Sequence, residues 1–160
     1  MHVKIFTTGG TIDKVYFDAQ SEYAVGEPLI AEILRKAGVT VPYGIETLFR
    51  KDSLEPTAED RALITRRMQE EESQHVLSTH GTDTMVETAR ALQHFKWKTV
   101  VLVGSLMPAR FHDSDAVFNI GFAMAAVQTL PEGIHLAMNG RVFHPEHVRK
   151  NRTASRFESV

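Results

Sequence analysis

An alternation between short β-branched runs and segments with helical periodicity is the feature that most constrains the fold of this chain. Central strands are expected where Val, Ile and Thr cluster between turn residues, at Val3–Thr8, Val76–Thr79, Thr99–Gly104 and Ile134–Met138. Strands separated by helical patterns in this way are typical of a parallel α/β sheet. We therefore predict a doubly wound α/β fold, with an open, mostly parallel sheet and helices on both of its faces.

Helices are predicted where apolar residues recur every three or four positions. They are expected at Pro28–Ala37, from Thr57 to about Ser73, at Thr84–Phe95 and at Asp115–Thr129. Thr57 is the expected N-cap of the second helix, with Asp60 at its third position. The last of these helices is expected to turn four side chains toward the core, those of Phe118, Phe122, Ala125 and Ala126.

Three further segments have weaker patterns. Val39–Phe49 is predicted to supply a second strand region, interrupted by Pro42 and Gly44. Thr11–Gly26 shows no sustained periodicity and is predicted to be a long functional loop. Pro145–Val160 is predicted to be a basic, polar tail.

Length and composition bound the class of protein. We assign residues 1–160 to one domain, since 160 residues fall within the usual domain size. Lys and Arg number 18 against 20 Asp and Glu, and there is no cysteine. This balance indicates neither a nucleic-acid surface nor a disulfide framework. No apolar stretch approaches the ~20 residues of a membrane span, and the N-terminal sequence has no signal-peptide character. We predict a cytoplasmic protein that binds neither nucleic acid nor membrane.

Two hydroxyl-rich turns follow predicted strands, Thr8–Thr11 after the first and His80–Asp83 after Val76–Thr79. Ligands of open parallel sheets bind at the carboxyl ends of the strands, and glycine lets the backbone approach them closely. The structural alternative is a pair of tight turns, with Asp83 or Thr84 as the cap of the next helix. The coincidence of two such turns favours a binding site.

Known cofactor patterns are absent from the sequence. Neither a Gly-x-Gly-x-x-Gly fingerprint after the first strand nor a P-loop is present. His75 and His80 lack a third ligand at a recognisable spacing, and His144 with His147, beside Glu146, is a weaker candidate still. We therefore expect no cofactor and no metal.

Two segments resemble the signature segments of bacterial-type L-asparaginases. They are Phe6–Ile12 and Ser78–Met85, and the second is the more specific, because six consecutive residues from His80 match the family's usual wording. Five further segments are similar to the family in the same order along the chain: Ser21–Gly26, Asp52–Ser53, Val103–Pro108, Asp115–Asn119 and Val148–Asn151. The resemblance covers nearly the whole chain.

The resemblance implies hydrolysis of the side-chain amide of L-asparagine, and more slowly of glutamine, through a threonine-linked acyl intermediate. By motif position, Thr8 is the expected nucleophile and Tyr23 its activating partner. Thr82, Asp83 and Lys150 are the expected second triad, in which Thr82 places or activates the water. A threonine hydroxyl needs such a neighbouring base, because it is a weak nucleophile on its own.

The resemblance also implies which residues bind the substrate. Ser53 and Asp83 are expected to hold its α-carboxylate and α-amino group, and Gly9 and Gly81 to line the pocket with backbone. Asp13 stands where the family commonly has small residues, so it is expected to add a charge near the pocket.

Members of the family usually carry a second, smaller α/β domain after the lysine segment, and we expect that domain to be absent here. Three functions therefore stay open. The chain is a self-sufficient amidohydrolase, a non-catalytic amino-acid-binding module, or an amidotransferase-type subunit that needs a partner chain. An apolar surface where the second domain would dock predicts a homo-oligomer, a dimer or higher.

Overall fold

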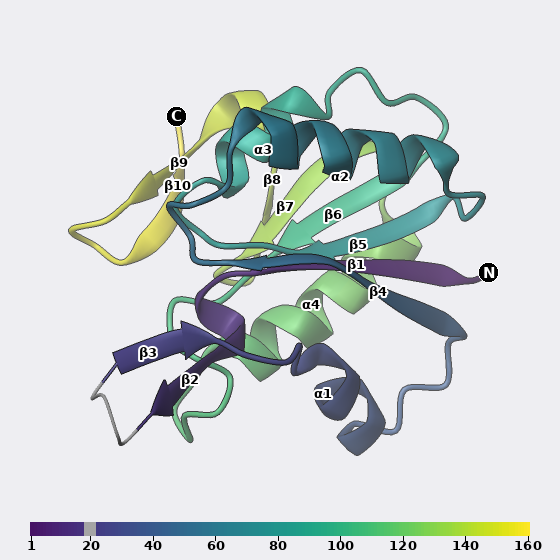
Figure 1. The fold of residues 1–160 in the computed structure, drawn as a ribbon. Coiled ribbons are helices and arrows are strands. Elements are labelled where there is room, and N and C mark those ends of the chain that lie inside the picture. The colour runs from purple at the N-terminus through teal and green to yellow at the C-terminus, as the bar shows by residue number, and fades with distance from the viewer. Residues whose placement is uncertain (18–21) are drawn as a thin grey trace.

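The computed structural model describes residues 1–17 and 22–160, and its centre is a six-stranded sheet in the order β4-β1-β5-β6-β7-β8 (Figure 1). Neighbouring strands from β4 to β7 run parallel, and β8 pairs antiparallel with β7 at one edge. The strands of this sheet are β1 (Val3–Gly9), β4 (Tyr43–Lys51), β5 (His75–Thr79), β6 (Thr99–Val103), β7 (Gly133–Met138) and β8 (Arg141–Phe143).

Helices cover both faces of the sheet, with α2 and α3 on one side and α1 and α4 on the other (Figure 1). They are α1 (Ile30–Lys36), α2 (Ala58–Glu70), α3 (Met85–Ala91) and α4 (Ala116–Thr129). The predicted doubly wound α/β fold is confirmed. Within the described ranges, no helix combines the length and the apolar character needed to cross a membrane.

The middle strands form the core of the molecule. Every residue of β6 is buried, and Val76 and Leu77 of β5 are fully buried beside it. A parallel sheet covered on both faces needs apolar side chains on both, so its strands read as continuous apolar runs. This is why the central strands could be predicted from the sequence.

The prediction of a loop at Thr11–Gly26 is wrong. The segment begins with a 3-10 turn, η1 (Thr11–Asp13), and continues as two strands, β2 (Lys14–Phe17) and β3 (Glu22–Val25). These strands pair antiparallel with each other and not with the main sheet. Four residues a strand are too few to establish a period in the sequence.

The prediction of a polar tail at Pro145–Val160 is also wrong. A 3-10 turn, η2 (Pro145–His147), leads into a hairpin of β9 (Val148–Asn151) and β10 (Arg156–Ser159). One apolar side chain of each strand, Val148 and Phe157, is buried against the core. Charged residues surround both of them, which hides the strands from a composition argument.

The second strand region is only partly as predicted, because residues 39–42 lie outside the strand, whereas Gly44 does not interrupt it. β4 begins directly after Pro42, whose carbonyl accepts a hydrogen bond from Val3 N at 2.9 Å, and Gly44 pairs with Lys4 within the ladder. β4 is an edge strand, where proline at the start and glycine inside the strand are tolerated. The strand continues to Lys51, two residues beyond the predicted end at Phe49.

The α4 helix faces the core with other residues than those predicted. Phe118 and Ala125 are exposed and Phe122 is half-buried, so of the four predicted side chains Ala126 alone is buried. The helix is apolar nearly all round, so its periodicity did not single out one face. Its buried face consists of Ala116, Asn119, Ile120, Ala123, Met124, Ala126 and Val127.

Helix ends were predicted less well than helix starts. The Thr57 and Asp60 side chains form a reciprocal capping box, as the spacing predicted. The α2 and α3 helices end at Glu70 and Ala91, each a few residues before the predicted end.

Candidate active site

The two hydroxyl-rich turns lie where the winding of the sheet reverses. β1 is flanked by β4 on one side and by β5 on the other, so the chain leaves β1 in one direction and leaves β5, toward β6, in the opposite one. Loops that diverge in this way open a crevice at the carboxyl ends of the strands. Thr8–Thr11 and His80–Asp83 both begin at the carboxyl ends of the two strands between which the winding reverses.

The backbones of three loops meet beside these turns without intervening side chains. A Cβ on Gly10 would lie 2.5 Å from the Cα of Gly81, and a Cβ on Gly81 would lie 2.6 Å from the Cα of Ser53. Gly10 also has a φ of +88°, which L side chains rarely adopt. Glycine is therefore required at this contact. Gly9, a predicted pocket residue, lies against Lys51, whose N and O atoms would be 2.7 Å from a Cβ.

Thr8 stands near the end of β1 and is 2% exposed. Its Oγ1 donates a hydrogen bond to the carbonyl of Thr79, at the end of β5, over 2.9 Å. A peptide carbonyl fixes the hydroxyl but cannot take its proton, so activation of Thr8 requires another group. The side chain of Tyr23, its predicted partner, lies outside the described part of the structure.

Lys150 connects the second turn to the β9–β10 hairpin. Its Nζ donates hydrogen bonds to Thr82 Oγ1 and to Asp83 Oδ1, each over 2.7 Å. Thr82 is 2% exposed, whereas the side chains of Lys150 and Asp83 are 16% and 22% exposed, so the cluster lies at the boundary between the protein interior and solvent. The three predicted members of the second triad are thus in direct contact.

Ser53 holds the start of the α3 segment. Its Oγ accepts a hydrogen bond from Asp83 N over 2.7 Å, and its carbonyl accepts one from Thr84 Oγ1 over 2.8 Å. Thr84 is the N-cap residue of α3, as one of the two alternatives predicted, but its side chain makes no capping hydrogen bond. The side chains of Asp83 and Thr84 are both engaged elsewhere.

Asp83 is surrounded by positive charge. Burial works to raise the pKa of this carboxyl, but the hydrogen bond and charge of Lys150, with the charge of Arg152, outweigh it and hold the pKa below its ordinary value. Arg152 Nε lies 3.1 Å from the same Oδ1 atom. A cleft of about 550 Å³ opens beside Asp83 and is lined by Lys150, Arg149 and Arg152, among others. The sequence reasoning missed Arg152, because one arginine in a basic segment carries no distinguishing signal.

His80 is a structural residue rather than a ligand. Its ring is fully buried, with Nδ1 2.8 Å from the carbonyl of Gly81 and Nε2 2.9 Å from Thr88 Oγ1. Burial lowers the pKa of His80 to about 4, so the ring is neutral at physiological pH. Its two bonds tie the second turn to α3.

Asp13 is buried at the base of the β2–β3 hairpin. Its Oδ1 accepts a hydrogen bond from Leu29 N over 2.9 Å, and its main-chain carbonyl accepts one from Gly26 N over 2.8 Å. Its Oδ2 is buried without a hydrogen-bond partner among the described residues. Burial raises the pKa of Asp13 to about 6, against the smaller opposing effects of Leu29 and Arg50. Asp13 therefore fastens both ends of the hairpin.

This fold and site define a doubly wound α/β protein with buried threonine hydroxyls and a Lys150–Asp83 ion pair at the switch point of its sheet. The model of the family described as Asparaginase, N-terminal, matches residues 2–160, and the chain belongs to this family.

Relatives with known names support the assignment. The chain is 32% identical to the L-asparaginase of Thermococcus kodakarensis, in an alignment covering 94% of this chain and 48% of that protein. It matches the solved structure of the thermostable L-asparaginase from Thermococcus kodakarensis with a TM-score of 0.85 at 26% identity, over 100% of this chain and 51% of that chain. It matches L-asparaginase I from Vibrio cholerae with a TM-score of 0.85 at 25% identity, over 99% of this chain and 51% of that chain.

A third solved structure is that of a probable cytoplasmic L-asparaginase from Campylobacter jejuni, with a TM-score of 0.82 at 25% identity, over 99% of this chain and 52% of that chain. The chain thus spans about half the length of the relatives it matches.

Proposed function

We propose that this chain is an amidohydrolase that converts L-asparagine to L-aspartate and ammonia through a threonine acyl-enzyme, with weaker activity on glutamine. The observation that carries the proposal is the position of Lys150 Nζ, 2.7 Å from both Thr82 Oγ1 and Asp83 Oδ1. The family and the names of the relatives support the substrate class.

The proposed reaction has two steps. In the first, Thr8 Oγ1 attacks the side-chain amide carbon, its proton passes through Tyr23 to the leaving nitrogen, and ammonia departs from the acyl-enzyme. In the second, a water placed by Thr82 attacks the acyl carbon, its proton returns to Thr8, and aspartate is released. Each step needs donors for the developing oxyanion, and main-chain N–H groups of the second turn are suited to this role.

Asp83 and Ser53 are the proposed substrate-binding residues, with main-chain groups of Gly9 and Gly81 beside them. A carboxylate whose pKa is held down stays ionised and can bind the substrate's α-ammonium group. Lys150 and Arg152 both contact Oδ1 of Asp83, and we assign the ammonium to Oδ2. Ser53 Oγ accepts a hydrogen bond from Asp83 N, which fixes the Ser53 hydroxyl next to Asp83.

Ammonia release from L-asparagine, measured beside L-glutamine, tests the proposal. Thr8→Ala should lower the rate by about a thousandfold or more, because the attacking oxygen is removed. Thr40→Ala, at an exposed threonine remote in sequence from the turns, is the matched control and should keep full activity. Activity that survives Thr8→Ala would disprove the role of Thr8.

Two other functions give different results in the same assay. A non-catalytic amino-acid-binding module is stabilised by asparagine against heat but releases no ammonia. An amidotransferase-type subunit releases ammonia only when its partner chain is added. Because the chain spans about half of its relatives, the assay should be run with and without the remaining half of such a relative.

We also propose that the protein is cytoplasmic and that residues 1–160 fold as one domain. The absence of cysteine is compatible with a reducing compartment. Coincident urea transitions followed by far-UV circular dichroism and tryptophan fluorescence would support one domain, and separate transitions would contradict it.

Self-association through α4 is the proposed origin of a homo-oligomer. Val117 and Phe118 are 59% and 62% exposed, and the Phe118 ring stacks on that of Phe122 at 6.4 Å. Exposed apolar side chains gathered in this way favour contact with a second copy. Light scattering should show a dimer or higher oligomer that Phe118→Ser weakens, whereas a monomeric wild-type chain would refute the proposal.

A further inference from the structure

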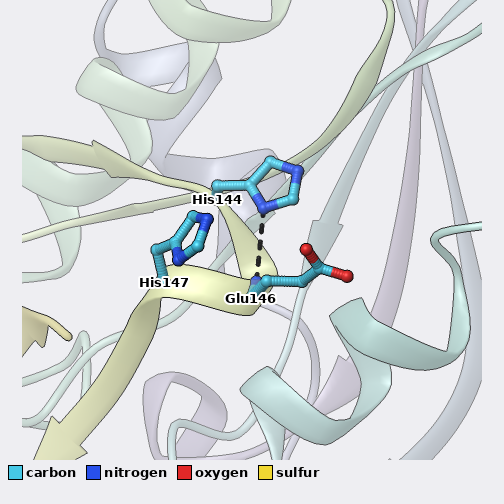
Figure 2. Close-up of side chains that lie close together, drawn as sticks. All are labelled: His144, Glu146 and His147. Carbon is cyan, nitrogen blue, oxygen red and sulfur yellow. Dashed lines mark hydrogen bonds between the residues drawn. The ribbon is translucent and has the colours of Figure 1, made fainter.

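Two histidines and a glutamate lie close together at the η2 turn. None of them belongs to the hydrogen-bonded cluster around Lys150. His144, Glu146 and His147 are all exposed, and each offers one ligand atom such that the three atoms lie within 4.8 Å of one another. Figure 2 shows the three side chains projecting from this single turn. The sequence alone makes His144 and His147, beside Glu146, a weak candidate for a metal site. The structure shows that the three ligand atoms lie close together.

The turn that carries these side chains is held in place by buried neighbours. Phe143, Pro145 and Val148 alternate with the exposed residues and are themselves buried. Arg90 of α3 donates a hydrogen bond from Nε to the carbonyl of Pro145 over 3.0 Å. His147 N also donates to the carbonyl of His144 over 3.0 Å. The backbone is thus fixed, while the three donor side chains are exposed to solvent.

Two imidazoles and one carboxylate form a ligand set that binds zinc and leaves a fourth position for water. Bonds of about 2.0–2.1 Å in a tetrahedron place the donor atoms about 3.4 Å apart. The three atoms need to approach by little more than an ångström, which rotation of exposed side chains can supply. The neutral form of each imidazole is the one that binds metal.

Binding has one identifiable cost in this turn. His144 Nδ1 accepts a hydrogen bond from Glu146 N over 3.3 Å, which places the proton of the neutral ring on Nε2 (Figure 2). Zinc at Nε2 requires that proton to move to Nδ1, so this bond is lost. At 3.3 Å it is a long hydrogen bond, and its loss is smaller than the gain from three zinc bonds.

We propose that His144, Glu146 and His147 bind one divalent zinc ion, with water as the fourth ligand. The ion binds on the outer surface of η2, directly before β9, the strand that carries Lys150. Bound zinc therefore holds the start of that strand in the folded position. The zinc site does not rest on the proposed hydrolase activity, since the three side chains can bind the ion whether or not the chain hydrolyses asparagine.

Isothermal titration of the tag-free, EDTA-treated chain with zinc chloride tests this site. The wild type should bind one ion with an affinity on the order of micromolar. His147→Ala should weaken binding by about tenfold or more, and Glu146→Gln should weaken it to a lesser degree. His112→Ala is the matched control, because His112 is equally exposed, next to Asp113 on a different loop, and its loss should leave zinc binding unchanged.

A second measurement distinguishes direct coordination of the metal by His147 from an indirect effect of the substitution on the turn. The electron paramagnetic resonance spectrum of one bound Cu²⁺ should show coupling to two imidazole nitrogens in the wild type and to one in His147→Ala. All substituted side chains are exposed, so the variants should fold, as circular dichroism checks. Absence of saturable zinc binding, or equal binding by wild type and His147→Ala, would overturn the proposal.

Discussion

The buried carboxyl of Asp13 gives this protein a pH dependence whose sign and size follow from its surroundings. Burial raises its pKa from the ordinary 3.8 to about 6, so the folded state binds this proton more tightly than the unfolded chain. The stabilisation is complete below the unfolded pKa and is lost as the pH rises through about 6. A shift of this size corresponds to about 3 kcal/mol at most, of which roughly 2–3 kcal/mol is lost between pH 4 and pH 7.

Asp13→Asn isolates this effect. The amide oxygen can still accept the hydrogen bond from Leu29 N, but the side chain no longer titrates. The free energy of unfolding should be measured by urea titration at several pH values for both proteins. The wild type should lose roughly 2–3 kcal/mol relative to Asp13→Asn as the pH rises from 4 to 7.

The control for Asp13→Asn is the same substitution at an exposed aspartate. Asp113→Asn removes the same negative charge from an exposed loop, where the side chain is 86% exposed. The free energy of unfolding of the wild type minus that of Asp13→Asn should fall as the pH rises. If this difference stays constant over the pH range, or increases with pH, the buried carboxyl does not titrate as argued. A difference in the free energy of unfolding that does not change with pH would come from placing an amide nitrogen where Oδ2 lies, and not from ionisation of Asp13.

Three further tests, two of them with a comparison variant, concern other parts of the structure. Gly10→Ala should destabilise the protein by about 2–4 kcal/mol in urea titrations, because Gly10 has a positive φ and an added Cβ would clash with the backbone of Gly81. Gly121→Ala, on the open side of α4, should instead stabilise it by about 0.5–1 kcal/mol. Thr57→Ala should cost about 1 kcal/mol in the same titrations by breaking the capping box of α2, and an unchanged midpoint would contradict that box. Lys150→Met should abolish ammonia release and let the pKa of Asp83 rise, while Arg156→Met, on the same hairpin but outside the cleft, should retain activity; equal activity of the two variants would exclude the proposed triad.

The strands that could be predicted from the sequence are those that are buried on both faces along most of their length. β1, β5, β6 and β7 lie in the middle of a sheet covered on both faces, so their composition reflects one condition, burial. The β2–β3 and β9–β10 hairpins lie outside the main sheet; each strand of β9–β10 buries one side chain, Val148 or Phe157, and none of the described side chains of β2 and β3 is buried. A short strand of that kind depends on contacts far away in sequence, which a local pattern cannot report.

The candidate site divides in the same way. Thr8, Thr82 and Asp83 could be predicted as site residues from their position after strands, without any resemblance to a family. Lys150 reaches Asp83 across 67 residues of sequence, and Arg152 does so across 69. The residues alone indicated neither contact: the family resemblance supplied Lys150, and the structure added Arg152.

The β9–β10 hairpin separates the assembly of the sheet from the completion of the Lys150 cluster. All six strands of the main sheet precede Lys150 in the chain, and the hairpin pairs with none of them. During synthesis the sheet can therefore form while Thr82 and Asp83 still lack their lysine. The Lys150 bonds then form only when the hairpin docks through Val148 and Phe157, so they report the last stage of folding among these elements. A variant that weakens docking, such as one at Phe157, would keep the sheet and lose the cluster.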